Sequence, residues 1–223
     1  MKIGIIQATS QVTKNKILCE TVKEINKDKQ IEIINFGCFE EEKENYSYVE
    51  IALEICLLIS SHAVDFVVTG CSSGQGMMIA CNSLPNLICG YCPTPQDAYL
   101  FGRINDGNVV SIPLGLNYGW AGEINLKSTL YQLFHEPFGI GYPASQAKRK
   151  MKDTALLKNI NRLSKKNIIE VFEQIDENLV HKILSKDNVI HYILKNGKDK
   201  DIINWIKENK NENDNERVSG NGY

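Results

Sequence analysis

The sequence predicts an α/β protein in which five strands form one parallel sheet with helices on both faces. Short apolar runs alternate five times with longer segments of helical periodicity. The runs are apolar almost throughout, which is typical of strands that are covered on both faces. In an open sheet of this kind, ligands bind at the carboxyl ends of the strands, near the point where the strand order reverses. The segments expected there are 8–11, 37–38, 70–76, 92–95 and 113–118.

The first two units follow from polarity and spacing. Met1–Gln7 is an apolar run that ends in a polar cluster, and Gln11–Asn26 repeats apolar residues at helical spacing between Lys and Glu. Ile31–Phe36 is a second apolar run and ends at glycine. Tyr48–Ile59 then carries an apolar stripe that predicts a helix packed on the sheet. The stripe consists of Val49, Ala52, Leu53, Cys56 and Ile59.

The other three units repeat the alternation. Phe66–Thr69 is a third strand, and a glycine-rich loop joins it to a helix over 77–82. The fourth and fifth units are expected as strands at 87–92 and 109–112 and as helices at 95–103 and 123–134. Together these elements predict one domain over residues 1–147.

The composition changes at about residue 148. Residues 148–207 are rich in Lys, Asn, Ile, Leu and Glu at helical spacing, which predicts a helical extension. A lid over the site and a brace between subunits are both open as its role. Residues 208–223 are polar and poor in apolar side chains, so we expect disorder there.

The charge balance and the cysteine content limit the classes of partner. The chain has 25 basic and 27 acidic residues and a formal net charge of -2, which argues against a dedicated nucleic-acid or anionic-membrane binder. No run approaches the roughly 18 apolar residues that span a bilayer, and the first run is too short for a secretory segment. The seven cysteines are odd in number and several lie in apolar stretches, as expected of reduced thiols. We expect a cytoplasmic protein.

The strongest chemical signal is the loop Gly70-Cys71-Ser72-Ser73-Gly74-Gln75-Gly76-Met77-Met78, between a buried strand and a helix. A cysteine there meets backbone N–H groups and the positive end of a helix, which favours the thiolate. The alternative is a glycine-rich turn that only allows close packing. Met77 stands where a Walker loop or a cysteine phosphatase needs other residues, and Ile79 stands where a dinucleotide fingerprint needs glycine.

Two further motifs have alternative interpretations. Cys89-Gly90-Tyr91-Cys92 is a C-x-x-C sequence, but it lies in a predicted strand and has no second half for a zinc site. Residues 103–108, Arg-Ile-Asn-Asp-Gly-Asn, suit a self-capping turn or a site for sugar hydroxyls. The four histidines are scattered, and His135 is the one considered as a candidate.

Four motifs occur together in this chain: the loop at 70–77, Ala80-Cys81-Asn82, Asp97-Ala98 and Asn105-Asp106-Gly107-Asn108. In this combination the chain resembles the type B ribose-5-phosphate isomerase and galactose-6-phosphate isomerase family over roughly residues 1–145. The resemblance implies a Rossmann-like sheet, a homodimer or homotetramer with sites near the interface, and no metal or organic cofactor.

The resemblance also implies roles for individual residues. Cys71 would be the base that moves a proton between C1 and C2 of an open-chain sugar, and Ser73 stands where the family has threonine. Asn105 matches a substrate-binding asparagine. The enediolate oxygen would be held by the backbone amides of Ser72, Ser73, Gly74, Gln75, Gly76 and Met77.

Three positions depart from the family pattern. The Asp-His pair at the end of the first strand is replaced within Ala8-Thr9-Ser10-Gln11, and the ring-opening histidine is Ile104. Phosphate-binding arginines are not evident near residues 139–143, although Arg149 lies a little beyond. We expect Ser10 and Gln11 to bind sugar hydroxyls, and the substrate to be a hexose phosphate or a sugar without phosphate.

Three hypotheses follow from the sequence. The first is an aldose-ketose isomerase of a sugar or sugar phosphate, with Cys71 as base. The second is a catalytically silent protein that binds such a sugar. The third is thiol redox chemistry through Cys89 and Cys92.

Overall fold

The predicted sheet is present. The computed structural model describes the backbone of residues 1–219 and the side chains of residues 1–210. Five parallel strands form one sheet in the order β2-β1-β3-β5-β4. They are β1 (Lys2–Ile6), β2 (Glu32–Gly37), β3 (Phe66–Cys71), β4 (Cys89–Tyr91) and β5 (Val109–Pro113). Because β2 and β3 flank β1 on opposite sides, the strand order reverses between β1 and β3.

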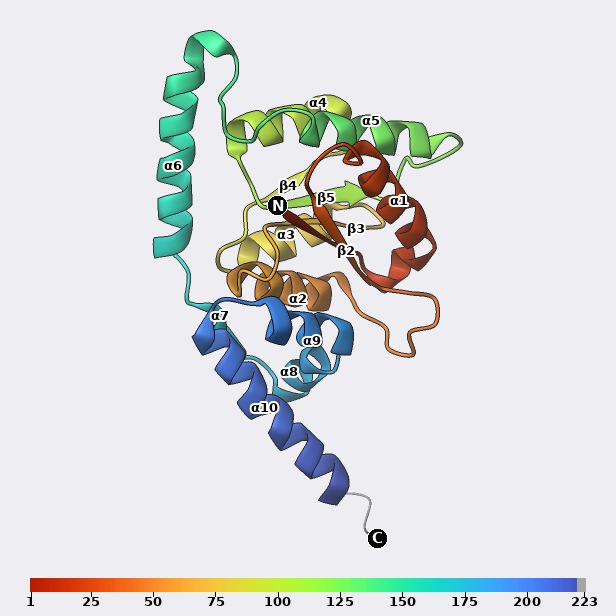
Figure 1. The fold of residues 1–223 in the computed structure, drawn as a ribbon, viewed down its shortest axis with the longest axis vertical. Coiled ribbons are helices and arrows are strands. Elements are labelled where there is room, and N and C mark those ends of the chain that lie inside the picture. The colour runs from red at the N-terminus through yellow and green to blue at the C-terminus, as the bar shows by residue number, and fades with distance from the viewer. Residues whose placement is uncertain (220–223) are drawn as a thin grey trace.

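Helices cover both faces of the sheet (Figure 1). One face carries α1 (Asn15–Ile25), α4 (Pro95–Leu100) and α5 (Gly122–Phe134), and the other carries α2 (Tyr48–Ser60) and α3 (Gln75–Ser83). A 3-10 turn over Thr9–Lys14 precedes α1, and a π-helical turn over Phe101–Asn105 follows α4. These two irregular turns account for most of the difference from the expected ranges 11–26 and 95–103.

The strands divide their side chains between two hydrophobic clusters. Phe66 and Val68 of β3 face the α1, α4 and α5 layer, whereas Val67 points to the α2 and α3 layer. Val109 and Val110 of β5 divide in the same way. Apolar residues are therefore needed at successive positions, and the strands read as continuous apolar runs.

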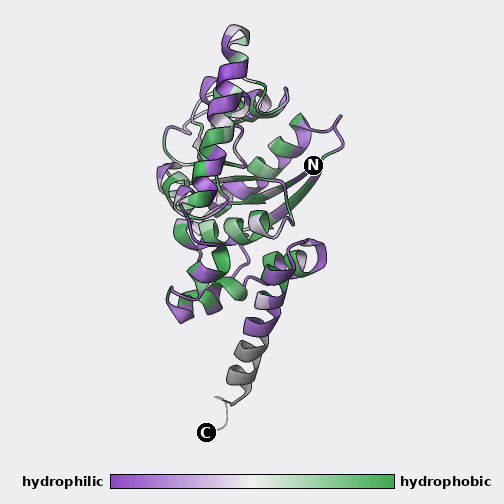
Figure 2. Ribbon diagram, turned by 90° about the vertical axis from the view of Figure 1, so that its left-hand side faces the viewer, coloured by the Kyte–Doolittle hydropathy of each residue, from purple (hydrophilic) through white to green (hydrophobic). Residues whose placement is uncertain are grey.

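The extension consists of five helices. They are α6 (Ala147–Leu163), α7 (Ile168–Phe172), α8 (Glu177–Leu184), α9 (Asp187–Asn196) and α10 (Lys200–Ser219), and α6 is preceded by a 3-10 turn over Ala144–Gln146. α6 stands beside the domain with hydrophilic and hydrophobic residues mixed along it (Figure 2). α7, α8 and α9 contact the outer side of α2. Where disorder was expected from residue 208, the helix α10 continues to Ser219, and residues 220–223 lie outside the described part.

The covering of α2 changes the interpretation of its sequence. The apolar stripe predicted one buried side, but every residue from Ile51 to Ser60 is buried. Val49, a member of the stripe, is 43% exposed. The reason is that the sheet covers one side of α2 and the extension covers the other, so apolar residues on both sides are buried.

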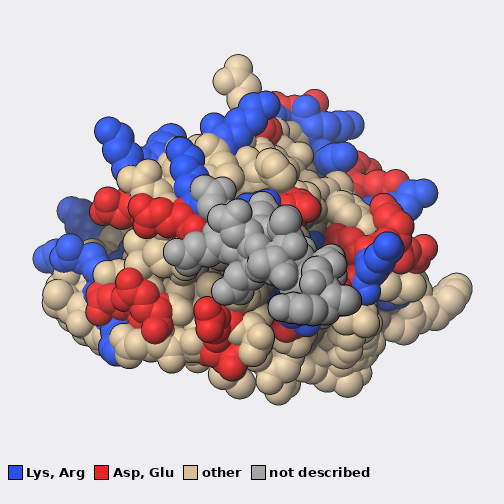
Figure 3. Space-filling model, turned by 90° about the horizontal axis from the view of Figure 1, so that it is seen from below, with Lys and Arg blue, Asp and Glu red and all other residues tan. Residues whose placement is uncertain are grey.

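At the end of the molecule that carries the extension, the described residues form no extended region of one charge. Basic and acidic side chains are interspersed over this face (Figure 3). Among the described helices, none is both long and apolar enough to cross a membrane.

Glu54 is an exception within the buried side of α2. It is fully buried, and neither carboxylate oxygen has a hydrogen-bond partner in the described part of the chain. Burial raises the pKa of Glu54 well above its ordinary value, and the nearby Lys186 opposes this shift only in part. An uncompensated buried carboxylate is unfavourable, so the native state favours the protonated acid.

The change Glu54→Gln should raise the melting temperature at pH 8 and leave it nearly unchanged at pH 5. A raised pKa means that the folded state holds a proton that the unfolded chain releases, so stability falls as pH rises above the ordinary glutamate pKa. Calorimetry at both pH values, with the exposed Glu20→Gln as control, measures the difference. An equal gain at both pH values would contradict this explanation.

Candidate active site

Cys71 ends β3 at the reversal of strand order. The end of β1 lies beside it, because the backbone N–H of Ala8 donates to the carbonyl of Gly70 at 3.1 Å. Cys71 is 8% exposed and lines a cavity of about 600 Å³. The other residues that line this cavity are Ala8, Thr9, Ser10, Asn45, Tyr46, Ser47, Tyr48, Glu50 and Lys182. We call this space the Cys71 cavity.

Two glycines allow the loop after β3 to pass close to β5. A Cβ on Gly70 would lie 2.4 Å from the carbonyl oxygen of Ile112. Gly74 has φ of +75°, and a Cβ there would lie 2.9 Å from the backbone nitrogen of Pro113. A side chain at either position would push β5 away or strain the backbone.

In this loop three carbonyl groups are hydrogen-bonded, while most of the backbone N–H groups have no partner among the described residues. The N–H of Leu114 donates to the carbonyl of Cys71 at 3.0 Å, and two following N–H groups donate to the carbonyl of Ser72. The Oγ of Ser111 donates to the carbonyl of Gly74 at 2.7 Å. In the loop segment 72–77, the backbone N–H groups with no hydrogen-bond partner in the described part of the chain are those of Ser72, Ser73, Gly74, Gly76 and Met77. Such a set of amides at the start of a helix suits an anionic oxygen.

The structure brings several of the expected residues together. Ser10 lines the Cys71 cavity, and the Nε2 of Gln11 donates to the Oγ of Ser72 at 2.9 Å and to the carbonyl of Ser10 at 2.7 Å. Ser73 has a local role, since its Oγ accepts the N–H of Gln75 at 3.3 Å near the start of α3. The Met77 side chain is buried in the core, so only its backbone faces the loop.

Asn105 does not join this group within one chain. It lies at the end of the π-helical turn and lines a separate hollow of about 400 Å³. Cys89, Asp97 and Leu157 of α6 line the same hollow.

The sequence analysis missed one wall of the Cys71 cavity. This wall is formed by Tyr46, Ser47, Tyr48 and Glu50, with Lys182 from the extension. Ser47 and Glu50 form a capping box at the start of α2, a pattern that is visible in the sequence. Tyr48 is 44% exposed, and its ring packs against Gly76 in the first turn of α3. No local signal marked Lys182.

The cysteines of the C-x-x-C sequence are buried free thiols. Burial raises the pKa of Cys92 to about 12 and raises the pKa of Cys89 well above its ordinary value. Buried protonated thiols react poorly, which weighs against redox chemistry at this pair. Over the described residues, no three His, Cys, Asp or Glu side chains come together as metal ligands.

A family model described as Ribose/Galactose Isomerase matches residues 3–134. The chain belongs to this family. It is therefore an aldose-ketose sugar isomerase, as the motifs implied. A comparison with curated proteins finds no match.

Two solved structures resemble nearly the whole chain, extension included. A 4-deoxy-L-threo-5-hexosulose-uronate ketol-isomerase, in complex with a tartrate, is 33% identical with a TM-score of 0.90, and the match covers 95% of this chain and 100% of that one. A ribose-5-phosphate isomerase from Vibrio parahaemolyticus is 31% identical with a TM-score of 0.88, and the match covers 94% of this chain and 99% of that one. The type B ribose 5-phosphate isomerase of Trypanosoma cruzi shares the fold at 22% identity and a TM-score of 0.55. That match covers 71% of this chain and 97% of that one.

Iodoacetamide at pH 8 should modify Cys71 before the other cysteines. Cys71 is the most exposed of the seven, and burial raises the pKa of Cys56 and of Cys92 to about 12. A thiol with that pKa is ionised to about one part in ten thousand at pH 8. Peptide mapping by mass spectrometry gives the order of modification, with Cys71→Ser as control. Earlier modification of Cys89 or Cys92 would revive the redox hypothesis.

Proposed function

We propose that this isomerase moves a proton between C1 and C2 of an open-chain sugar with Cys71 as the base. The thiolate removes the proton from the carbon beside the carbonyl, and the electron pair moves to the carbonyl oxygen to give a cis-enediolate. The thiol then gives a proton to the former carbonyl carbon, and the hydroxyl proton of the neighbouring carbon passes to the former carbonyl oxygen. While it is held on the thiol, the transferred proton can exchange with solvent. The observation that carries the proposal is the position of Cys71, in a cavity at the reversal of strand order and directly before a loop of unpaired amides.

The loop amides suit the charge that develops in this reaction. An enediolate concentrates negative charge on oxygen, and fixed N–H donors stabilise such charge without having to reorganise. Because the carbonyl groups of Cys71, Ser72 and Gly74 are held by bonds from 111–116, the orientation of the loop is set before a substrate binds. We assign hydroxyl binding to Ser10 and Gln11, and enediolate binding to the amides from Ser72 to Met77.

The substrate class follows from the relatives only as a proposal. One of the two similar structures is named for a uronate and the other for a pentose phosphate. Both substrates are sugars with an anionic group, and an anionic sugar is the substrate class we propose. No histidine lines the Cys71 cavity in the described part of the chain, so its lining residues do not identify the group that opens the sugar ring.

Incubation of the protein with a sugar panel in deuterated water should place deuterium at C1 or C2 of at least one sugar. The panel contains ribose 5-phosphate, galactose 6-phosphate, 4-deoxy-L-threo-5-hexosulose-uronate and the neutral sugars ribose and galactose. Cys71→Ala should lower the exchange rate about 10²- to 10⁴-fold, since it removes the base. NMR of the products measures the incorporation.

The variant Cys92→Ala is the matched control, since it removes a buried thiol that does not line the Cys71 cavity. Its exchange rate should equal that of the wild type. Equal exchange in wild type and Cys71→Ala, or binding of a sugar without exchange in both, would contradict Cys71 as the base.

We also propose that the chain forms a homodimer or homotetramer through α6. Five apolar side chains on this helix are between 45% and 72% exposed: Met151, Leu156, Leu157, Ile160 and Leu163. Exposed apolar residues repeated along one helix are typical of a subunit interface. Leu157 also lines the hollow that contains Asn105. A second copy docked there would cover this hollow and offer a route for Asn105 to serve a neighbouring site.

Wild-type protein should have at least twice the monomer mass in solution by light scattering. The double variant Leu156→Asp with Leu163→Asp should shift it to monomer, because two charges would be buried in the contact. Lys23→Asp, an exposed change on α1 and away from this helix, is the control and should keep the assembly. A monomeric wild type would contradict the proposal.

A further inference from the structure

The extension supplies one charged side chain to the Cys71 cavity, Lys182 of α8. Its Nζ lies 2.7 Å from the Oε1 of Glu50 and donates to the carbonyl of Asn45 at 2.7 Å. An ammonium group has three N–H donors, and these two contacts use two of them. The side chain is 32% exposed and lines the cavity, and these two contacts leave one N–H without a partner among the described residues.

Glu50 holds Lys182 in position. One oxygen of Glu50 faces Lys182, and the other accepts the N–H of Ser47 at 2.6 Å in the capping box. Partial burial alone would raise the pKa of Glu50, but the hydrogen bonds from Lys182 and Ser47 outweigh it and lower the pKa. The carboxylate therefore stays ionised, and both its oxygens are engaged by fixed donors.

The wall that carries Lys182 is tied to the reacting end of the cavity. The N–H of Thr9 donates to the carbonyl of Tyr46 at 3.0 Å, and the N–H of Tyr46 donates to the Oγ1 of Thr9 at 2.8 Å. The Lys182 Nζ lies 5.5 Å from the centre of the Tyr46 ring. Lys182 and Cys71 thus line the same cavity, and hydrogen bonds between Tyr46 and Thr9 tie the wall beside Lys182 to the end of β1.

We propose that Lys182 binds the anionic group of the substrate, a carboxylate or a phosphate, while the other end of the sugar lies at Cys71. This inference rests on the proposed function and assigns the extension a part in substrate specificity. Lys182 and Glu50 are the only lysine, arginine or acidic side chains that line the Cys71 cavity among the described residues. Since Glu50 is already engaged by its own donors, the remaining N–H of Lys182 is the cationic contact open to a ligand.

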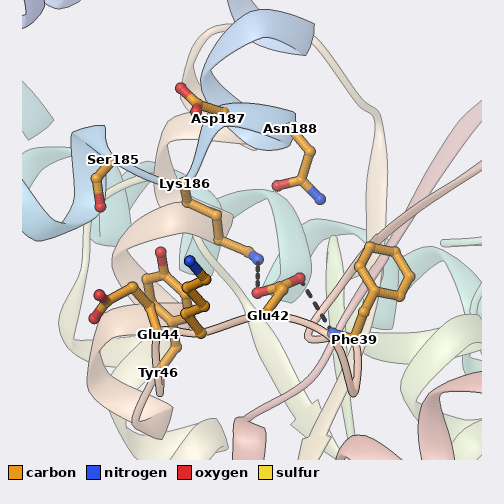
Figure 4. A pocket seen from close by; sticks show the side chains of 9 residues that line it. Phe39, Glu42, Glu44, Tyr46, Ser185, Lys186, Asp187 and Asn188 are labelled. Carbon is orange, nitrogen blue, oxygen red and sulfur yellow. Dashed lines mark hydrogen bonds and ion pairs between the residues drawn. The ribbon is translucent and has the colours of Figure 1, made fainter.

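Lys186 provides a matched comparison. It lies one turn further along the chain, in the connection between α8 and α9, and pairs with Glu42 at 2.8 Å (Figure 4). Its Nζ lies 4.7 Å from the centre of the same Tyr46 ring. It lines a different hollow of about 360 Å³ with Phe39 and Asn188, and it does not line the Cys71 cavity. Both lysines tie the extension to the domain, but only Lys182 reaches the cavity.

The test compares Lys182→Met, Lys182→Arg and Lys186→Met in a Cys71→Ser background, where binding is separated from turnover. Calorimetric titration uses D-glucuronate, D-galactose 6-phosphate and neutral D-galactose. Lys182→Met should lower the affinity for the preferred acidic sugar roughly 10- to 100-fold, which is the effect of losing a charged hydrogen bond. Lys182→Arg should retain most of the affinity, and neutral galactose should bind equally to all variants.

The sugar whose affinity depends on Lys182 identifies the anionic group as carboxylate or phosphate. Lys186→Met should lower the melting temperature without changing the affinity. Equal affinity of Lys182→Met and its parent for both acidic sugars, or equal losses in Lys182→Met and Lys186→Met, would overturn the inference. Failure of the proposed function is detected separately in the deuterium experiment, where the protein with Cys71 intact would incorporate no deuterium into any sugar.

Discussion

The burial of α2 between the sheet and the extension is the constraint on which the rest of the structure depends. One hydrophobic cluster runs from Val67 of the sheet through α2 to Ile190 and Ile193 of α9. A helix with apolar residues on all sides requires cover on all sides. The helices α7 to α10 of the extension are therefore part of the core, and packing within this cluster sets their position.

This packing also determines where charged groups meet. The seam between α2 and the extension brings Lys182 to Glu50 and Lys186 to Glu42, with the ring of Tyr46 near both ammonium groups. Glu54 lies deeper and has no hydrogen-bonding partner in the described part of the chain. In each of the two ion pairs near the surface, the charges balance each other. The buried carboxylate of Glu54 has no such partner among the described residues, so it destabilises the fold at this point when it is ionised.

The features that could be predicted are those encoded locally. The parallel sheet follows from successive apolar residues, and the loop at 70–77 follows from glycines that β5 requires, as the close approach of Gly70 to Ile112 shows. Lys182 could not be predicted, because its place depends on packing between distant segments. Asn105 shows a second limit: a match by position does not bring a side chain to Cys71 within one chain. The sequence of α2 also has apolar residues outside the expected stripe. These residues indicate that a second layer, the extension, packs on the other side of the helix.

The site must accommodate two negative charges when an anionic sugar reacts. Because Lys182 is paired with Glu50, the wall of the Cys71 cavity brings no net positive charge. The charge of the substrate and the charge that develops on the enediolate oxygen would otherwise repel each other in a partly enclosed space. The proposed arrangement separates them: Lys182 of the extension binds the charged group of the substrate, and the neutral amide dipoles beside Cys71 stabilise the enediolate oxygen. Amides suit the second task because they act over short range and stay fixed as charge appears. In this proposed arrangement the extension takes part in substrate choice, and the loop after β3 takes part in the proton transfer.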